Sequence, residues 1–126
     1  MSIPVEVADL AKALDDFGAG YLLTNRAGAV KVVTVEPTVT NGVVLIEGPG
    51  RGTVANLAEN AAVTLVFPPR EPRGFTLLVD GTAEVAGDDV RVSPTGAVLH
   101  RPASHADGPP APEGCGNDCA PLPSTA

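Results

Sequence analysis

The stretch "GPGRGTVANLAENAAVTLVF", residues 48–67, passes through three local patterns that decide the fold around it. A glycine-rich loop carries a single cation, Arg51, residues 54–60 resemble a short helix, and residues 62–67 form an apolar run typical of a strand. Thr53 suits the N-cap of this helix, because its hydroxyl can accept a bond from an unpaired N–H group. Free N–H groups beside a guanidinium favour an anion site, and a solvated arginine in a turn is the alternative.

Short runs rich in Val, Leu and Thr on both sides of this stretch predict further β-strands. Asn41 and Gly42 form a pair typical of tight hairpins, so we expect the strands before and after them to be antiparallel neighbours. The segment "PPREPRG", residues 68–74, is too rich in proline to continue a strand, and Pro94 interrupts the last strand. The expected strands are residues 21–24, 30–36, 41–48, 62–67, 75–85 and 89–101.

The two ends of the chain differ in composition. Residues 5–17 place their apolar side chains at helical spacing, and Gly18 ends the pattern. Six strands with short N-terminal and mid-chain helices predict a mainly β protein, an antiparallel barrel that is closed or nearly closed, over residues 1–101. Residues 102–126 are rich in Pro, Gly and Ala, and we expect a tail packed on or near the barrel.

The overall composition excludes some classes of partner. The chain has 126 residues and a net charge of −7, with only 8 Lys and Arg, so a phosphate-backbone ligand such as nucleic acid is not expected. The first residues lack the basic start and apolar run of a signal peptide, and no stretch has the length of a membrane span. We therefore expect a cytoplasmic protein that does not bind membranes.

The order of four segments resembles the FMN-binding split-barrel family, which includes pyridoxamine 5'-phosphate oxidase-like proteins. After the N-terminal helix, "YLLTNRAGAVKVVTVEP" is similar to the first hairpin of that family. The stretch "NGVVLIEGPGRGTVANLAENAAVTLVF" is similar to its strand, basic loop, helix containing "NL" and following strand. Finally, "FTLLVDGTAEV" is similar to its strand with the pattern V-x-G-x-A-x-V, so the resemblance covers residues 5–92.

The resemblance implies a six-stranded antiparallel split barrel that forms a homodimer, with FMN or a deazaflavin coenzyme in a cleft between the subunits. The implied coenzyme-binding residues are Arg51, Thr53 and Lys31 at the phosphate and Thr24, Val33 and Thr34 at the isoalloxazine ring. The implied activity is that of a flavin- or deazaflavin-dependent oxidoreductase, in which the coenzyme supplies the hydride chemistry. The alternative is a haem- or metal-binding split-barrel protein without turnover.

All histidines and cysteines lie in the last third of the chain, at His100, His105, Cys115 and Cys119. Imidazole and thiolate are common zinc ligands, so these residues are a candidate metal set. Some split-barrel relatives use a histidine of a C-terminal segment as a haem ligand, which makes haem a second candidate. A disulfide or redox pair of Cys115 and Cys119, or an inert tail, are the remaining interpretations.

Overall fold

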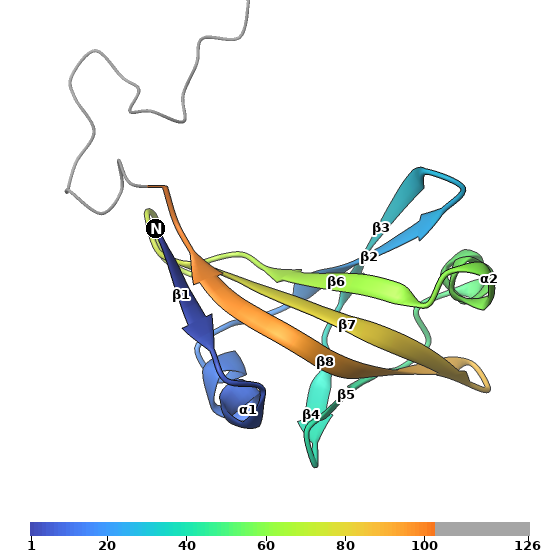
Figure 1. The fold of residues 1–126 in the computed structure, drawn as a ribbon, viewed down its shortest axis with the longest axis horizontal. Coiled ribbons are helices and arrows are strands. Elements are labelled where there is room, and N and C mark those ends of the chain that lie inside the picture. The colour runs from blue at the N-terminus through green and yellow to red at the C-terminus, as the bar shows by residue number, and fades with distance from the viewer. Residues whose placement is uncertain (103–126) are drawn as a thin grey trace, which may run out of the picture.

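The computed structural model describes residues 1–102, which form eight strands and two short α-helices (Figure 1). The strands are β1 (Ser2–Val5), β2 (Gly20–Arg26), β3 (Ala29–Val35), β4 (Thr38–Thr40), β5 (Val43–Ile46), β6 (Ala62–Phe67), β7 (Thr76–Ala86) and β8 (Asp89–His100). The helices are the 3-10 turn η1 (Val7–Asp9), α1 (Leu10–Leu14) and α2 (Arg51–Glu59). No helix of this part of the chain is long and apolar enough to cross a membrane.

All strand pairs of the sheet are antiparallel, in the order β3-β2-β6-β7-β8-β5-β4, with β1 paired to β8. The long hairpin β7–β8 crosses the middle of the molecule in Figure 1, and the β2–β3 hairpin and the β4–β5 hairpin lie on its opposite sides. The mainly β, antiparallel fold expected from the sequence is confirmed. The sheet has eight strands where six were expected, and it is not closed, because β3 and β4 end the pairing order.

Pro94 does not interrupt the last strand, contrary to the sequence-based expectation. β8 continues from Asp89 to His100, and its pairing with β7 shifts register beside Asp80 and Gly81, so that one residue of β8 bulges there. On the other edge of β8, β5 pairs with residues 90–92 and β1 pairs with residues 97–100. Pro94 lies between these two partners, where its missing N–H group removes no bond to either of them.

The sequence predicted that the strands on either side of Asn41 and Gly42 would be those over residues 30–36 and 41–48, and this pairing is wrong. Both residues have positive φ, 52° and 78°, as a tight hairpin turn requires, so the turn itself is confirmed. It joins β5 to the three-residue strand β4, which the sequence pattern missed, and β3 pairs with β2 instead. The expected hairpin over residues 21–36 is confirmed, since β2 and β3 pair with one another.

The N-terminal helix is shorter than expected over residues 5–17. Residues 2–5 form β1, because the free edge of β8 offers backbone partners that a first helical turn would not have. The apolar face of the remaining helical segment is nevertheless as expected, since Leu10 is buried and Leu14 and Phe17 pack against the core.

The core lies on one side of the sheet and consists almost entirely of aliphatic side chains. Alternate residues of each strand enter it, as in β7, where Leu77 and Val79 are fully buried and the residues between them are not. Phe67 is the largest buried side chain, and its ring lies 6.4 Å from that of Phe17. The opposite side of β2, β3, β6 and β7 therefore presents the other half of the strand residues.

Candidate functional site

The helix α2 begins at Arg51, three residues earlier than the helix over residues 54–60 that the sequence predicted with Thr53 as its N-cap. Gly50 is the N-cap, with φ 107°, a conformation that favours glycine, and no side chain bonds to the exposed N–H groups. The first N–H group to reach an acceptor in the helix belongs to Val54, which bonds to the carbonyl of Gly50 at 3.1 Å. The N–H groups of the first turn are therefore free to bind an anion.

A second cation lies at this helix start. A Cβ atom on Gly52 would overlap the Nζ atom of Lys31, so the ammonium group lies against the first turn of α2 in the space that a side chain at position 52 would fill. Arg51 is the adjacent residue, and within residues 1–102 neither cation has an ion-pair partner. Two positive side chains beside the positive end of a helix repel one another, and an anion between them would remove that repulsion.

Thr53 lies fully buried in the first turn of α2. Its Oγ1 atom has no hydrogen-bond partner among the described residues. A buried hydroxyl without a hydrogen bond costs about 1–3 kcal/mol of stability. A ligand oxygen that accepted a hydrogen bond from this hydroxyl would recover much of that cost. The orphaned hydroxyl and the two cations at this helix start fit the phosphate group that the family resemblance implied here.

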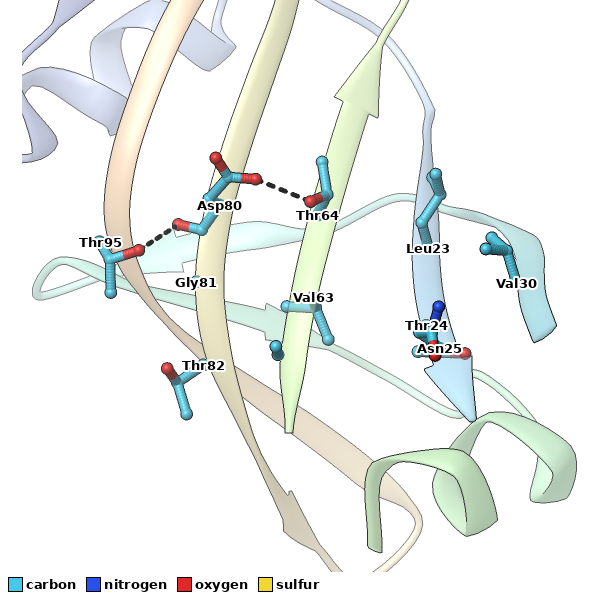
Figure 2. Close-up of a pocket in the computed structure, with 11 residues that line it drawn as sticks. Leu23, Thr24, Asn25, Val30, Val63, Thr64, Asp80, Gly81, Thr82 and Thr95 are labelled. Atoms are coloured by element: carbon cyan, nitrogen blue, oxygen red, sulfur yellow. Dashed lines mark hydrogen bonds between the residues drawn. The ribbon is translucent and has the colours of Figure 1, made fainter. Parts of the chain in front are cut away.

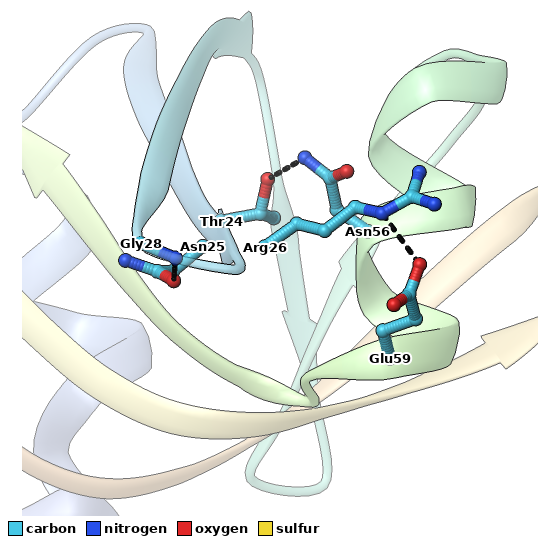
Figure 3. Close-up of polar contacts among 6 residues, drawn as sticks. All are labelled: Thr24, Asn25, Arg26, Gly28, Asn56 and Glu59. Atoms are coloured by element: carbon cyan, nitrogen blue, oxygen red, sulfur yellow. Dashed lines mark hydrogen bonds and ion pairs between the residues drawn. The ribbon is translucent and has the colours of Figure 1, made fainter.

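Side-chain contacts hold α2 against the sheet (Figure 3). The amide of Asn56 donates to the hydroxyl of Thr24 at 3.1 Å, and Arg26 forms an ion pair with Glu59 across the same gap at 2.5 Å. The ion pair is half-exposed and contributes little, about 0–1 kcal/mol, whereas the bond to Thr24 is partly buried. The sequence analysis missed Asn56, whose only signal was a polar side chain inside a short helix.

The loop before α2 is fixed from another side. The carboxylate of Asp89, at the start of β8, accepts a bond from the N–H of Gly48 at 3.0 Å. This bond joins residues 41 positions apart, so it orients the glycine loop relative to the β7–β8 hairpin.

The structure brings only some of the predicted coenzyme residues together. Lys31, Arg51 and Thr53 meet at the start of α2, as described. Thr24 is buried and its hydroxyl already accepts the bond from Asn56, so Thr24 supports α2 rather than presenting a free group. Val33 packs against the core, and Thr34 is exposed opposite Tyr21 on the other side of the hairpin, so these two cannot line one surface.

The predicted metal or haem set lies largely outside the described residues. Of its four members only His100 is described, at the end of β8, where its Nδ1 atom is 3.0 Å from the hydroxyl of Ser2. His105, Cys115 and Cys119 lie beyond residue 102, and so does the predicted tail apart from Pro102. Within residues 1–102 no group of His, Cys, Asp and Glu side chains could hold a metal ion. The zinc, haem, disulfide and inert-tail interpretations stay predictions.

Two mycobacterial proteins are similar to this chain over nearly its whole length. They are the uncharacterized protein Mb0449c of Mycobacterium bovis and the uncharacterized protein MT0457 of Mycobacterium tuberculosis, each 39% identical over 135 aligned positions. The alignments cover 91% of this chain and 92% of each relative. No protein-family model matches the chain.

Solved structures with the same fold have much lower sequence identity. An FAD-binding protein from Mycobacterium smegmatis aligns with a TM-score of 0.58 at 19% identity, covering 80% of this chain and 100% of that one. An FAD-binding protein from Mesorhizobium loti aligns with a TM-score of 0.61 at 14% identity, covering 79% and 96%. An F420 reductase aligns with a TM-score of 0.57 at 19% identity, covering 68% and 93%. Pyridoxamine 5'-phosphate oxidase-like structures also match, which confirms the split-barrel fold.

Proposed function

We propose that this chain, which belongs to one family with the two mycobacterial proteins and has the split-barrel fold, binds a flavin-type coenzyme by its phosphate group at the start of α2. The observation that carries the proposal is the position of Lys31, whose ammonium group occupies the space above Gly52 next to Arg51. Two unpaired cations, free N–H groups and an orphaned hydroxyl there match the donors that a phosphate monoester or diester needs. Solved proteins of this fold that are named for FAD or F420 support a flavin or a deazaflavin as the coenzyme.

The residues of this chain have defined parts in such a complex. Arg51 provides planar donors and Lys31 a point charge, so that together they fix the phosphate from two sides. Asn56 and Thr24 keep α2 in place while the phosphate binds. When bound, the coenzyme supplies hydride chemistry, and the protein supplies its anchor and orientation. We therefore propose an oxidoreductase, with coenzyme carriage without turnover as the other outcome of an activity assay.

We also propose that the protein is a homodimer. Tyr21 and Val32 are 41% and 54% exposed, and both lie on the side of the β2–β3 hairpin that faces away from the core. Apolar side chains gathered on one uncovered sheet face favour burial against a second copy. Sedimentation equilibrium should give twice the chain mass of 12.7 kDa. A single-chain mass at all concentrations tested would contradict the dimer.

The phosphate anchor is tested by comparing ligands that differ in the phosphate alone. FMN and riboflavin share the ring, so the ratio of their dissociation constants, measured by flavin fluorescence quenching, reports the contribution of the phosphate. Replacing Arg51 by Ala removes charge-assisted bonds worth about 1.5–3 kcal/mol, which is roughly a ten- to hundredfold loss of FMN affinity. The affinity for riboflavin should stay the same. The affinity for coenzyme F420 should fall as that for FMN does if the site accepts a phosphodiester.

Arg91→Ala provides the matched control for this measurement. Arg91 is an exposed arginine of β8, so its removal changes the net charge equally without touching α2. It should leave FMN affinity within about twofold, because salt screens the effect of an exposed charge that does not bind the phosphate directly. An Arg51→Ala variant that binds FMN as tightly as the wild type would refute the proposed anchor.

A further inference from the structure

A hollow of about 490 Å³ opens over β2, β3, β6, β7 and β8, in a part of the molecule that the phosphate site does not use (Figure 2). Most of the side chains around it alternate with core residues along their strands, so it lies on the side of the sheet that faces away from the core. α2 packs on the other side of β2, where Asn56 bonds to the buried Thr24. The hollow and the start of α2 are thus separate sites.

The two ends of the hollow differ in chemistry. Figure 2 shows Leu23 and Val30 at the end formed by the β2–β3 hairpin, and Asp80, Thr82 and Thr95 at the end formed by β7 and β8. The first end is therefore mostly aliphatic, with the amide of Asn25 beside it, whereas the other combines hydroxyl groups with one carboxylate. A ligand that matched both ends would have an apolar body and one polar group.

The carboxylate of Asp80, an exposed residue, is oriented by one hydrogen bond. The hydroxyl of Thr64 donates to its Oδ1 atom at 2.7 Å, and the hydroxyl of Thr95 donates to the main-chain oxygen of the same residue at 3.3 Å. Thr95 reaches this position because the register of β7 and β8 shifts beside Asp80 and Gly81. Such bulges redirect a side chain relative to the regular sheet.

Asp80 also carries a charge that nothing in the described chain balances. It is the only ionisable residue that lines the hollow, and no Lys or Arg of residues 1–102 forms an ion pair with it. Its Oδ2 atom has no bond to any described residue and is free to accept one. A single carboxylate with hydroxyl groups is too few anionic ligands for a divalent metal, but it suits an ammonium group, which donates three bonds.

We propose that this hollow binds a small organic cation that has an apolar body, with its ammonium group on Asp80 and its body against Leu23 and Val30. The site does not depend on the proposed coenzyme, since none of its polar groups belongs to α2 or to the glycine loop. The hydroxyl groups of Thr82 and Thr95 lie at the same end and can accept further bonds from the ammonium group.

Two probes that differ in charge alone test this proposal. The 2-phenylethylammonium ion and 2-phenylethanol have the same ring and chain, and both are titrated into the full-length protein while the backbone amide signals of Thr64, Asp80 and Thr82 are followed by NMR. The wild type should bind the ammonium ion at least about tenfold more tightly than the alcohol, because a charge-assisted bond replaces a neutral one. Equal affinity for both probes, or no shift of these signals, would overturn the proposal.

Variants separate the charge from the shape of the hollow. Asp80→Asn keeps an oxygen that accepts from Thr64, so the fold is retained, and it should abolish the preference for the ammonium ion. Asp88→Asn makes the same chemical change in the exposed β7–β8 turn and should leave that preference intact. Leu23→Ala should weaken the binding of both probes equally. If Asp80→Asn instead converts a dimer to single chains and the wild type binds no probe, Asp80 pairs with a second copy and the proposal is wrong.

Discussion

The position of Lys31 makes the substitution Gly52→Ala informative, because it should change stability and phosphate binding in opposite directions. The new methyl group would occupy the space that now holds the end of the Lys31 side chain. Only the flexible end of that side chain obstructs it, since the Cε and Cδ atoms are 3.4 Å and 3.9 Å from the Cβ position. The ammonium group must therefore swing away, and the backbone of α2 can stay where it is.

The expected magnitudes follow from this geometry. Gly52 has no positive φ, so alanine fits its backbone and should stabilise the helix by about 0.5–1 kcal/mol. Displacing Lys31 removes one of the two cations from the phosphate. Because the long side chain can partly return, we expect the loss to be near the lower limit for a charge-assisted bond, about 1.4 kcal/mol, or tenfold in the dissociation constant of FMN.

Urea denaturation and flavin fluorescence quenching measure the two effects on the same sample. Ala55→Gly is the matched control, because position 55 is exposed in the same helix. It should lower the free energy of unfolding by about 1 kcal/mol and leave FMN affinity unchanged. Gly52→Ala that is more stable and still binds FMN as tightly as the wild type would show that Lys31 does not contact the phosphate, and the assignment of this residue would be wrong.

Three further substitutions test how the structure supports the site. Thr24→Val should destabilise the protein by about 1–3 kcal/mol in urea denaturation, because the amide of Asn56 loses its acceptor in a partly buried position. Gly81→Ala should cost about 1–3 kcal/mol or prevent folding, since its methyl group would lie 2.7 Å from a backbone oxygen of β8 that cannot move aside; unchanged thermal stability would contradict this packing. Asp89→Ala should cost about 0.5–1.5 kcal/mol and raise amide hydrogen exchange at Gly48, whereas unaltered exchange would mean that the loop is held in another way.

The sequence alone was sufficient for features that depend on a few neighbouring residues. Alternation of apolar residues located the β2–β3 hairpin and the strands β6 and β7, and the pair Asn41-Gly42 located a hairpin turn, because both signals act within one strand or one turn. The sequence also predicted a helix after the glycine loop but placed Arg51 before it, whereas Arg51 is the first residue of α2. These patterns were enough to indicate a mainly β fold, whereas the anion site near Arg51 stays a prediction.

Only the tertiary structure decided which segments are neighbours. β1 is a strand because β8 leaves an edge free, and β8 passes through Pro94 because its outer partners change at that point. Likewise, Lys31 reaches Gly52 only because α2 packs against the β2–β3 hairpin, and Asp80 borders a hollow only because four other strands line it with β7. Local preferences fix the conformation of a segment, whereas the partner of a strand edge or a side chain depends on contacts between distant residues, whose free energy no local pattern encodes.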